Sequence, residues 1–301
     1  MRGPVAGGFF RAGAPVLQWM DASRLLRYGR AMRAIDRYAR LGGRRFHYLD
    51  WGTRGAPAVL MLHGGAQTAH SFDEVAPVLA RGHHVVCLDQ RGHGDTAWAP
   101  RYRRNDFVAD IDAMLDHLGW ETASLVGMSL GGLNAIAFAA SCPARMRTLV
   151  VVDVVPSVAP EGRDAIAKQL SVQEFASFDD AVAMAHAFNP RRTLENIRER
   201  LGHAMRGFPD GRWRYKFDPD IVSGAHDLER QWADVRRIRC PALLVRGAES
   251  PIVTHEGTER FLALVPGSRT AEVAGAGHSV MGDNPTGFLD AVGPFLARHG
   301  A

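Results

Sequence analysis

A serine flanked by glycines has the clearest chemical meaning in this sequence. Ser129 lies in Gly127-Met128-Ser129-Leu130-Gly131, between an apolar run (SLV) and an apolar, helix-forming run (GGLNAIAFAA). This context predicts a sharp strand-to-helix turn that points the hydroxyl into a cleft. Glycine is expected two residues away on each side, where larger side chains would collide with neighbouring backbone. Ser129 is therefore the candidate nucleophile, and the alternative is a chance pentapeptide in a chain of 32 glycines.

A histidine near the end of the chain is the candidate general base. His278 lies in GAGHSVMGDNP, directly after the short strand-like run TAEV. A histidine on a loop after the last strand can reach across to the serine, whereas a merely structural His278 is the alternative. Position decides among the thirteen histidines, because six others precede a strand, lie in a turn or lie in a long insertion (His83, His84, His93, His186, His203 and His226).

Backbone N–H groups near the serine are candidates for stabilising negative charge on a carbonyl oxygen. An oxyanion hole needs two such donors. Leu130, directly after the serine, is expected to supply one, and Gly65 in His63-Gly64-Gly65 is expected to supply the other, with Ala66 as the alternative donor. His63 is interpreted as bracing this loop rather than as a base.

The elements that must hold these residues alternate between strands and helices. Apolar runs such as PAVLMLHGG, HHVVCLDQRG and PALLVRGAE predict strands buried on both faces, and VADIDAMLDHLG predicts a helix between two of them. The pattern predicts a doubly wound, mostly parallel α/β sheet. We divide the chain into a basic N-terminal extension (1–43), the first part of the core (44–155), a helical lid (156–239) and the second part of the core (240–301).

The order of the motifs resembles the α/β-hydrolase superfamily. A strand followed by HGG, then LDQRGHGDT, GMSLGG and a final GAGH occur in this order, and the resemblance covers about residues 44–155 and 240–301. GMSLGG, LVVVDVVP, GRWRYKFD, LLVRGAES and GHSV resemble, more narrowly, mycobacterial-type carboxylesterases. The resemblance implies an α/β-hydrolase fold and a Ser–acid–His triad.

The acid of that triad departs from the pattern common in the family. Many members carry it in Gly-x-x-Asp after the penultimate strand, where this chain has Gly247-Ala248-Glu249-Ser250. Asp153, at the end of LVVV and one strand after the nucleophile strand, is the favoured candidate, because some members place the acid there. The alternatives are Glu249 and the more distant Asp283 and Glu256.

Charge and composition exclude several other classes. The net charge is +4, but residues 1–40 hold +6, so the body is slightly negative, which argues against nucleic-acid binding. Residues 22–40 predict a basic amphipathic helix, which either packs on the domain or makes weak peripheral contact with a membrane. No run is long enough to span a membrane, no secretory signal is evident, and the three cysteines form no cluster. We expect a cytoplasmic protein.

Missing motifs narrow the reaction further. The sequence contains no GxxxxGK[ST], no GxGxxG that opens a helix, and no HExxH or paired Cys/His set, so we expect neither a cofactor nor a metal. We expect hydrolysis of small to medium carboxylic esters through an acyl-enzyme. A cofactor-free oxygenase or lyase and a non-catalytic binding protein are the alternatives. Apolar side chains could line the lid, or could simply form its core (Phe175, Phe178, Met184, Phe188 and Trp213).

Overall fold

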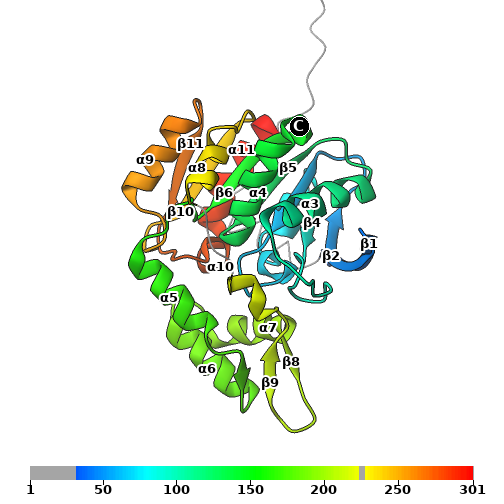
Figure 1. The fold of residues 1–301 in the computed structure, drawn as a ribbon, viewed down its shortest axis with the longest axis vertical. Coiled ribbons are helices and arrows are strands. Elements are labelled where there is room, and N and C mark those ends of the chain that lie inside the picture. Colours follow the sequence, from blue (N-terminus) through cyan, green and yellow to red (C-terminus); the bar gives the residue numbers. More distant parts are fainter. Residues whose placement is uncertain (1–31, 224–227, 301) are drawn as a thin grey trace, which may run out of the picture.

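The structure, a computed structural model, describes residues 32–223 and 228–300, and an eight-stranded sheet lies at its centre (Figure 1). Its strands are β1 (Ile35–Leu41), β2 (Arg44–Gly52), β3 (Ala58–Leu62), β4 (His84–Leu88), β5 (Ala123–Met128), β6 (Met146–Val152), β10 (Ala242–Gly247) and β11 (Arg269–Val273). They lie in the order β1-β2-β4-β3-β5-β6-β10-β11. The six strands from β4 to β11 are parallel, and β2 is antiparallel to both of its neighbours.

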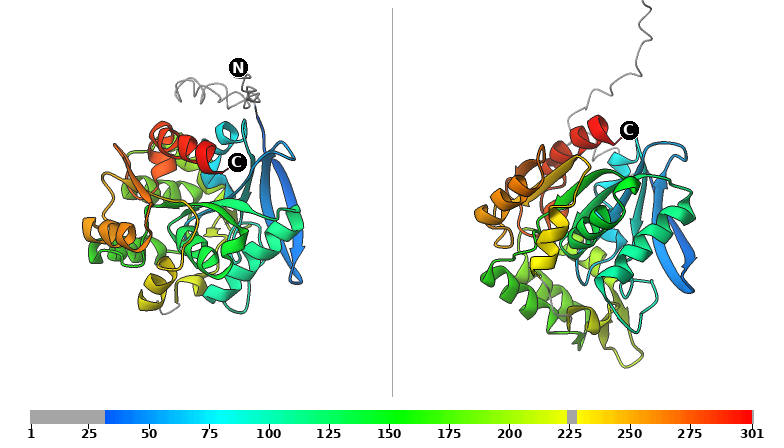
Figure 2. Two further views of the ribbon diagram at one scale, coloured as in Figure 1. Left: turned by 90° about the horizontal axis from the view of Figure 1, so that it is seen from above. Right: turned by 45° about the horizontal axis from the view of Figure 1, so that its top comes forward.

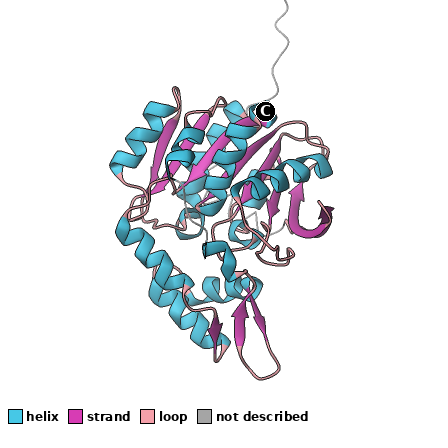
Figure 3. Cartoon of the chain, viewed as in Figure 1, coloured by secondary structure: helices cyan, strands magenta, loops and turns pink. Residues whose placement is uncertain are grey.

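Helices cover both faces of this sheet (Figure 3). One face packs against α3 (Arg104–Leu118), α4 (Leu130–Ser141), α8 (Leu228–Val235) and α9 (His255–Leu264). The other face packs against η1 (Ala69–Phe72), α2 (Ala76–Leu79), α10 (Val280–Asp283) and α11 (Pro285–His299). The short η2 (Pro143–Arg145) joins α4 to β6. Among the described residues, no helix has the length and apolar character needed to cross a bilayer.

The apolar strands are buried on both faces because successive side chains point to opposite sides of a sheet. In β3, Leu60 and Leu62 join the hydrophobic cluster on one face, and Val59 and Met61 join the cluster on the other. Continuous apolar runs are therefore required rather than alternating ones. The predicted doubly wound, mostly parallel α/β sheet is confirmed.

An insertion follows β6 and forms a separate layer at the lower end of the molecule in Figure 1. We define the insertion as residues 160–223; it has its own apolar core. It consists of α5 (Pro160–Leu170), β7 (Glu174–Phe175), α6 (Phe178–Phe188), α7 (Leu194–Ala204), β8 (Met205–Gly207), β9 (Trp213–Tyr215) and η3 (Pro219–Ser223). The structure differs in two respects from the helical lid that the sequence predicts over 156–239. The insertion contains a three-stranded antiparallel sheet, and α8 packs against α4 in the core.

The predicted amphipathic helix over 22–40 is also wrong where it can be compared. Residues 22–31 lie outside the described residues, and Ile35–Leu41 form the edge strand β1. Gly42 and Gly43 both have positive φ (53° and 81°) and form a two-residue hairpin, so that Leu41 pairs with Arg44. Ala39 and Leu41 point into the core in the alternation of a strand. The sheet thus begins at Ile35, inside the segment assigned to an extension. The strands coloured blue, from the start of the described chain, lie at one edge of the sheet (Figure 2).

Candidate active site

Ser129 occupies a strained turn between β5 and α4. Its φ of 51° lies in the left-handed region that residues with a side chain rarely adopt. The turn is held because Ser129 N–H donates to Val152 O at 3.1 Å. A Cβ on Gly127 would lie 2.3 Å from Gly131 O, and a Cβ on Gly131 would lie 2.2 Å from Leu62 O. Both glycines are therefore needed for the close approach of backbone segments at this turn.

The loop after β3 lies against this turn. Gly131 N–H donates to His63 O at 3.1 Å, and a Cβ on Gly64 would lie 3.3 Å from Ser129 Cβ. The fully buried His63 ring accepts the Gln90 N–H at Nε2 (3.0 Å) and therefore donates from Nδ1 to Gly64 O (2.7 Å). Burial lowers the pKa of His63, which keeps the ring neutral. His63 thus holds the shape of the loop and does not face the serine as a base.

The two expected oxyanion donors lie in this loop and at the start of α4. Leu130 is the first residue of α4, where N–H groups have no acceptor within the helix. Within the described chain, neither the Leu130 N–H nor the Gly65 N–H donates to a protein acceptor. A Cβ on Gly65 would have no other heavy atom of the described chain within 4 Å. A Cβ on Gly64 would lie 2.6 Å from Met128 Sδ. A side chain at 64 would therefore force the Met128 side chain to move, and its Cβ would lie 3.3 Å from Ser129 Cβ.

Asp153 lies directly after β6 and contacts His278. The buried Asp153 carboxylate has one oxygen 2.8 Å from His278 Nδ1, and its other oxygen accepts the Gly247 N–H at 3.0 Å. The Ser250 hydroxyl also donates to the oxygen that faces His278. Ser250 occupies the position at which the family pattern usually has its acid. Its hydroxyl therefore lies beside the carboxylate of Asp153, which follows the neighbouring strand β6. A serine at the position of the usual aspartate is the sequence signal for this contact.

The other candidate acids make different contacts. Glu249 is half exposed and pairs with Arg191 of the insertion, with Arg191 Nε 2.8 Å from the carboxylate. The Asp283 carboxylate is fully buried, accepts the Gly277 N–H at 3.0 Å and pairs with Arg192 at 3.0 Å, so it shapes the loop that carries His278. Glu256 lies in the first turn of α9. None of the three hydrogen-bonds to His278 in the described chain.

Ser129 and His278 are both partly exposed and come from neighbouring parts of one sheet edge. Ser129 follows β5, Asp153 follows β6 and His278 follows β11, so the carboxyl ends of parallel strands supply all three. Ligands of open α/β sheets bind at this edge. In the described structure the Ser129 hydroxyl does not hydrogen-bond to the His278 ring. Catalytic hydrogen bonds in free enzymes are often long, and they tighten when substrate binds.

The apolar lid residues mostly pack within the insertion itself. Phe175 contacts Tyr215, and Phe178 lies 4.6 Å from Trp213 between ring centroids. Met184 joins the same cluster, whereas Phe188 is exposed. These side chains thus form the core of the insertion, the second of the two roles that the sequence allowed.

A cavity of about 400 Å³ lies away from these residues, between the loop after β4 and the β8–β9 hairpin. Four cationic side chains and Asp95 line it (Arg45, Arg206, Arg214 and Lys216). Lys216 pairs with Asp95, and Arg214 pairs with Glu174. None of the candidate catalytic residues lines this cavity.

Comparison with known proteins places this geometry in a family. A family model described as alpha/beta hydrolase fold matches residues 57–285. The chain is 33% identical to esterase Rv0045c of Mycobacterium tuberculosis over 254 residues, which cover 81% of this chain and 84% of the esterase. It is 28% identical to a 3-hydroxybutyrate-oligomer hydrolase of Cupriavidus necator, over 79% of this chain and 88% of that protein.

Solved structures agree with the sequence comparison. The M. tuberculosis esterase superposes with a TM-score of 0.76 at 30% identity, covering 93% of this chain and 99% of the other. E-2-(acetamidomethylene)succinate hydrolase superposes with a TM-score of 0.80 at 26% identity, covering 88% and 99%. Both the superfamily resemblance and the narrower likeness to a mycobacterial esterase are confirmed.

Proposed function

The chain belongs to the α/β-hydrolase fold family and is a hydrolase related to esterases, and from this premise we propose that it cleaves small to medium carboxylic esters by a serine mechanism. The observation that carries the proposal is the left-handed backbone of Ser129 between two glycines that the packing requires. Such strain is typical of functional sites. A serine in a strained strand-to-helix turn presents its hydroxyl at the carboxyl end of the parallel strands.

The reaction would proceed in two acyl-transfer steps. Ser129 Oγ attacks the ester carbonyl while His278 Nε2 takes the hydroxyl proton, and the Gly65 and Leu130 N–H groups stabilise the oxyanion. The C–O bond to the alcohol breaks, and His278 returns the proton to the departing alcohol. A water then loses a proton to His278 and attacks the acyl-enzyme, which releases the acid and restores the Ser129 hydroxyl.

Asp153 would hold His278 in the required tautomer. Its oxygen at 2.8 Å accepts the Nδ1 proton, which leaves Nε2 free to take the serine proton. The carboxylate would also stabilise the imidazolium that forms during each step. Gly247 and Ser250 support the proposal because their hydrogen bonds fix the orientation of the carboxylate.

The test is replacement of Ser129 by alanine. We expect Ser129→Ala to reduce turnover of p-nitrophenyl esters by on the order of 10⁶, the effect of losing a triad nucleophile. A serine-directed phosphonate should label the wild type once and leave the variant unlabelled. The acyl-chain preference follows from the same assay with esters of graded length.

A rival function would give a different pattern. An oxygenase, a lyase or a non-catalytic binding protein need not acylate Ser129 during turnover. Activity of the variant within about tenfold of the wild type, or failure of the phosphonate to label the wild type, would contradict the proposal.

A further inference from the structure

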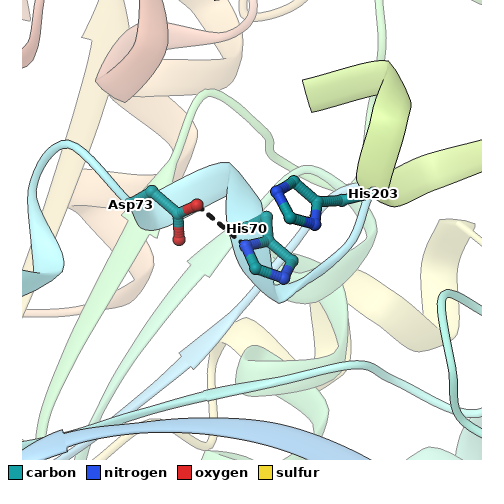
Figure 4. Close-up of side chains that lie close together, drawn as sticks. All are labelled: His70, Asp73 and His203. Carbon is teal, nitrogen blue, oxygen red and sulfur yellow. Dashed lines mark hydrogen bonds and ion pairs between the residues drawn. The ribbon is translucent and has the colours of Figure 1, made fainter. Parts of the chain in front are cut away.

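Two histidines and an aspartate meet where the insertion packs on the core (Figure 4). His70 lies in η1, Asp73 directly follows η1, and His203 lies in the last turn of α7. His70 Nδ1 is 2.8 Å from Asp73 Oδ2, and the His203 ring stacks on the His70 ring with 3.4 Å between centroids. One possible ligand atom from each of the three lies within 4.8 Å of the other two. The proposed acyl transfer uses none of them.

The groups in this cluster have unused capacity to bind a cation. Asp73 Oδ1 is buried and has no hydrogen-bond partner in the described chain. An unpaired buried oxygen of this kind is costly and calls for an explanation. Imidazole nitrogens and carboxylate oxygens are both ligands that divalent transition metals accept.

The surroundings supply space and negative charge. A cavity of about 20 Å³, enough for a single water or ion, is lined by the three side chains. Glu74 and Glu199 also line it, so that with Asp73 three carboxylates face two guanidinium groups, Arg200 in the lining and Arg192 beside it. Arg200 is itself engaged, because it donates to the Ser71 hydroxyl at 2.9 Å.

We propose that His70, Asp73 and His203 form a binding site for a divalent transition metal ion, Zn²⁺ above all, that joins the insertion to the core. Two imidazoles and one carboxylate suit Zn²⁺, Co²⁺ or Ni²⁺, whereas Mg²⁺ and Ca²⁺ prefer oxygen ligands alone. The sequence did not predict this set, because the third ligand lies 130 residues beyond Asp73 along the chain.

Binding requires a small local rearrangement. Ligands of a tetrahedral Zn²⁺ at about 2.0–2.2 Å from the ion lie roughly 3.3 Å from each other. The two rings are nearly parallel, at 12°, so one must rotate before both nitrogens can point at one ion. Coordination through His70 Nδ1, which now faces Asp73 Oδ2 at 2.8 Å, would require the ring proton to lie on Nε2.

The position of the site connects it with the candidate active site. His70 lies five residues after Gly65 on the segment that follows β3. Gly282, which also lines the small cavity, belongs to α10, the helix that begins two residues after His278. A bound ion would hold α7 against both segments, so we expect Zn²⁺ to slow ester hydrolysis by restraining the insertion.

The test measures metal binding without substrate. Tag-free, full-length protein is titrated with Zn²⁺ by calorimetry and with Co²⁺ by absorption spectroscopy, and one ion per chain is expected. His203→Gln and His70→Gln should each weaken binding by at least about tenfold. The matched control is His255→Gln, because His255 and Glu259 form a similar but exposed pair on α9, 3.2 Å apart, and it should bind like the wild type. Circular dichroism checks that each variant is folded.

The outcomes are distinct. Binding that is substoichiometric, that survives in both cluster variants, or that His255→Gln weakens equally would overturn the site. In a separate assay, Zn²⁺ should inhibit the wild type and leave His203→Gln unaffected, with equal rates for both in the absence of metal. Since metal binding is read without ester hydrolysis, failure of the esterase proposal would not affect this result.

Discussion

Replacing Asp153 with asparagine should preserve the fold and remove almost all activity. Asparagine tolerates the positive φ of 51° at this position better than most residues. The Gly247 N–H, which now donates to one carboxylate oxygen at 3.0 Å, could donate only to the oxygen of the asparagine amide. The amide NH₂ must then face His278 Nδ1, the atom that now lies 2.8 Å from the second carboxylate oxygen.

The magnitude follows from the tautomer that this contact enforces. An NH₂ group facing Nδ1 requires Nδ1 to accept a hydrogen bond, so the ring proton moves to Nε2. His278 can then no longer take the proton of Ser129. The same substitution in a serine protease triad lowers kcat by about 10⁴, or roughly 5.5 kcal/mol of barrier at 1.36 kcal/mol per tenfold.

The assay is steady-state hydrolysis of a p-nitrophenyl ester, with Glu249→Gln as the matched control. Glu249 is half exposed and pairs with Arg191, so its neutral variant should stay within about twofold of the wild type. A urea unfolding curve separates lost catalysis from lost stability. If Asp153→Asn stays within about tenfold of the wild type, or if Glu249→Gln proves the more damaged of the two, Asp153 is not the acid.

Three further outcomes are expected. Ser250→Ala removes the hydroxyl that donates to Asp153 and should lower kcat/KM by roughly 10- to 100-fold, the worth of a hydrogen bond to a charged group. Burial, and then His63, lowers the pKa of His93 to about 3, so the folded state binds fewer protons. His93 should therefore contribute a loss of stability on the order of 1.4 kcal/mol per pH unit below about pH 6.5, and urea unfolding should show a slope shallower by that amount in His93→Phe. Deleting residues 1–31 should leave ester hydrolysis unchanged but reduce co-sedimentation of the protein with anionic vesicles at low salt. Equal binding by the full-length and shortened proteins would exclude a role of residues 1–31 in membrane binding.

The core fold was predictable because its signals are local. Buried parallel strands require continuous apolar runs, and the turn at Ser129 requires glycine at 127 and 131, where a Cβ would meet backbone within 2.4 Å. Both requirements can be read in a short window of sequence. The order of the motifs then fixes which strand ends share an edge of the sheet.

The errors arose where local patterns are ambiguous or strands are short. Apolar residues near Ile35 fit a helical spacing, but the segment pairs with β2 as an edge strand. The pair Gly42-Gly43 predicts a tight β-hairpin, and this prediction agrees with the structure where the helical spacing does not. The strands of the insertion are only two or three residues long, too short for an alternation to be visible.

The contacts of the candidate acids depended on the tertiary structure. Asp153 and Ser250 lie 97 residues apart and meet because β6 and β10 are neighbours in the sheet. No window of sequence contains both residues. The same holds for Arg191 and Glu249, whose pairing turns Glu249 toward the insertion.

Backbone strain gives an independent indication of where the chemistry lies. In the described chain, only Ala66, Ser129 and Asp153 combine a side chain with a positive φ, and they follow β3, β5 and β6, three adjacent strands. Each such residue costs about 1–3 kcal/mol, and glycine would remove that cost. A side chain in such a position must therefore have a use that offsets the strain. Asp153 contacts His278, and Ala66 packs against the core of the insertion. The Ser129 hydroxyl makes no hydrogen bond that would stabilise the described fold, and this supports the proposal that Ser129 is the nucleophile.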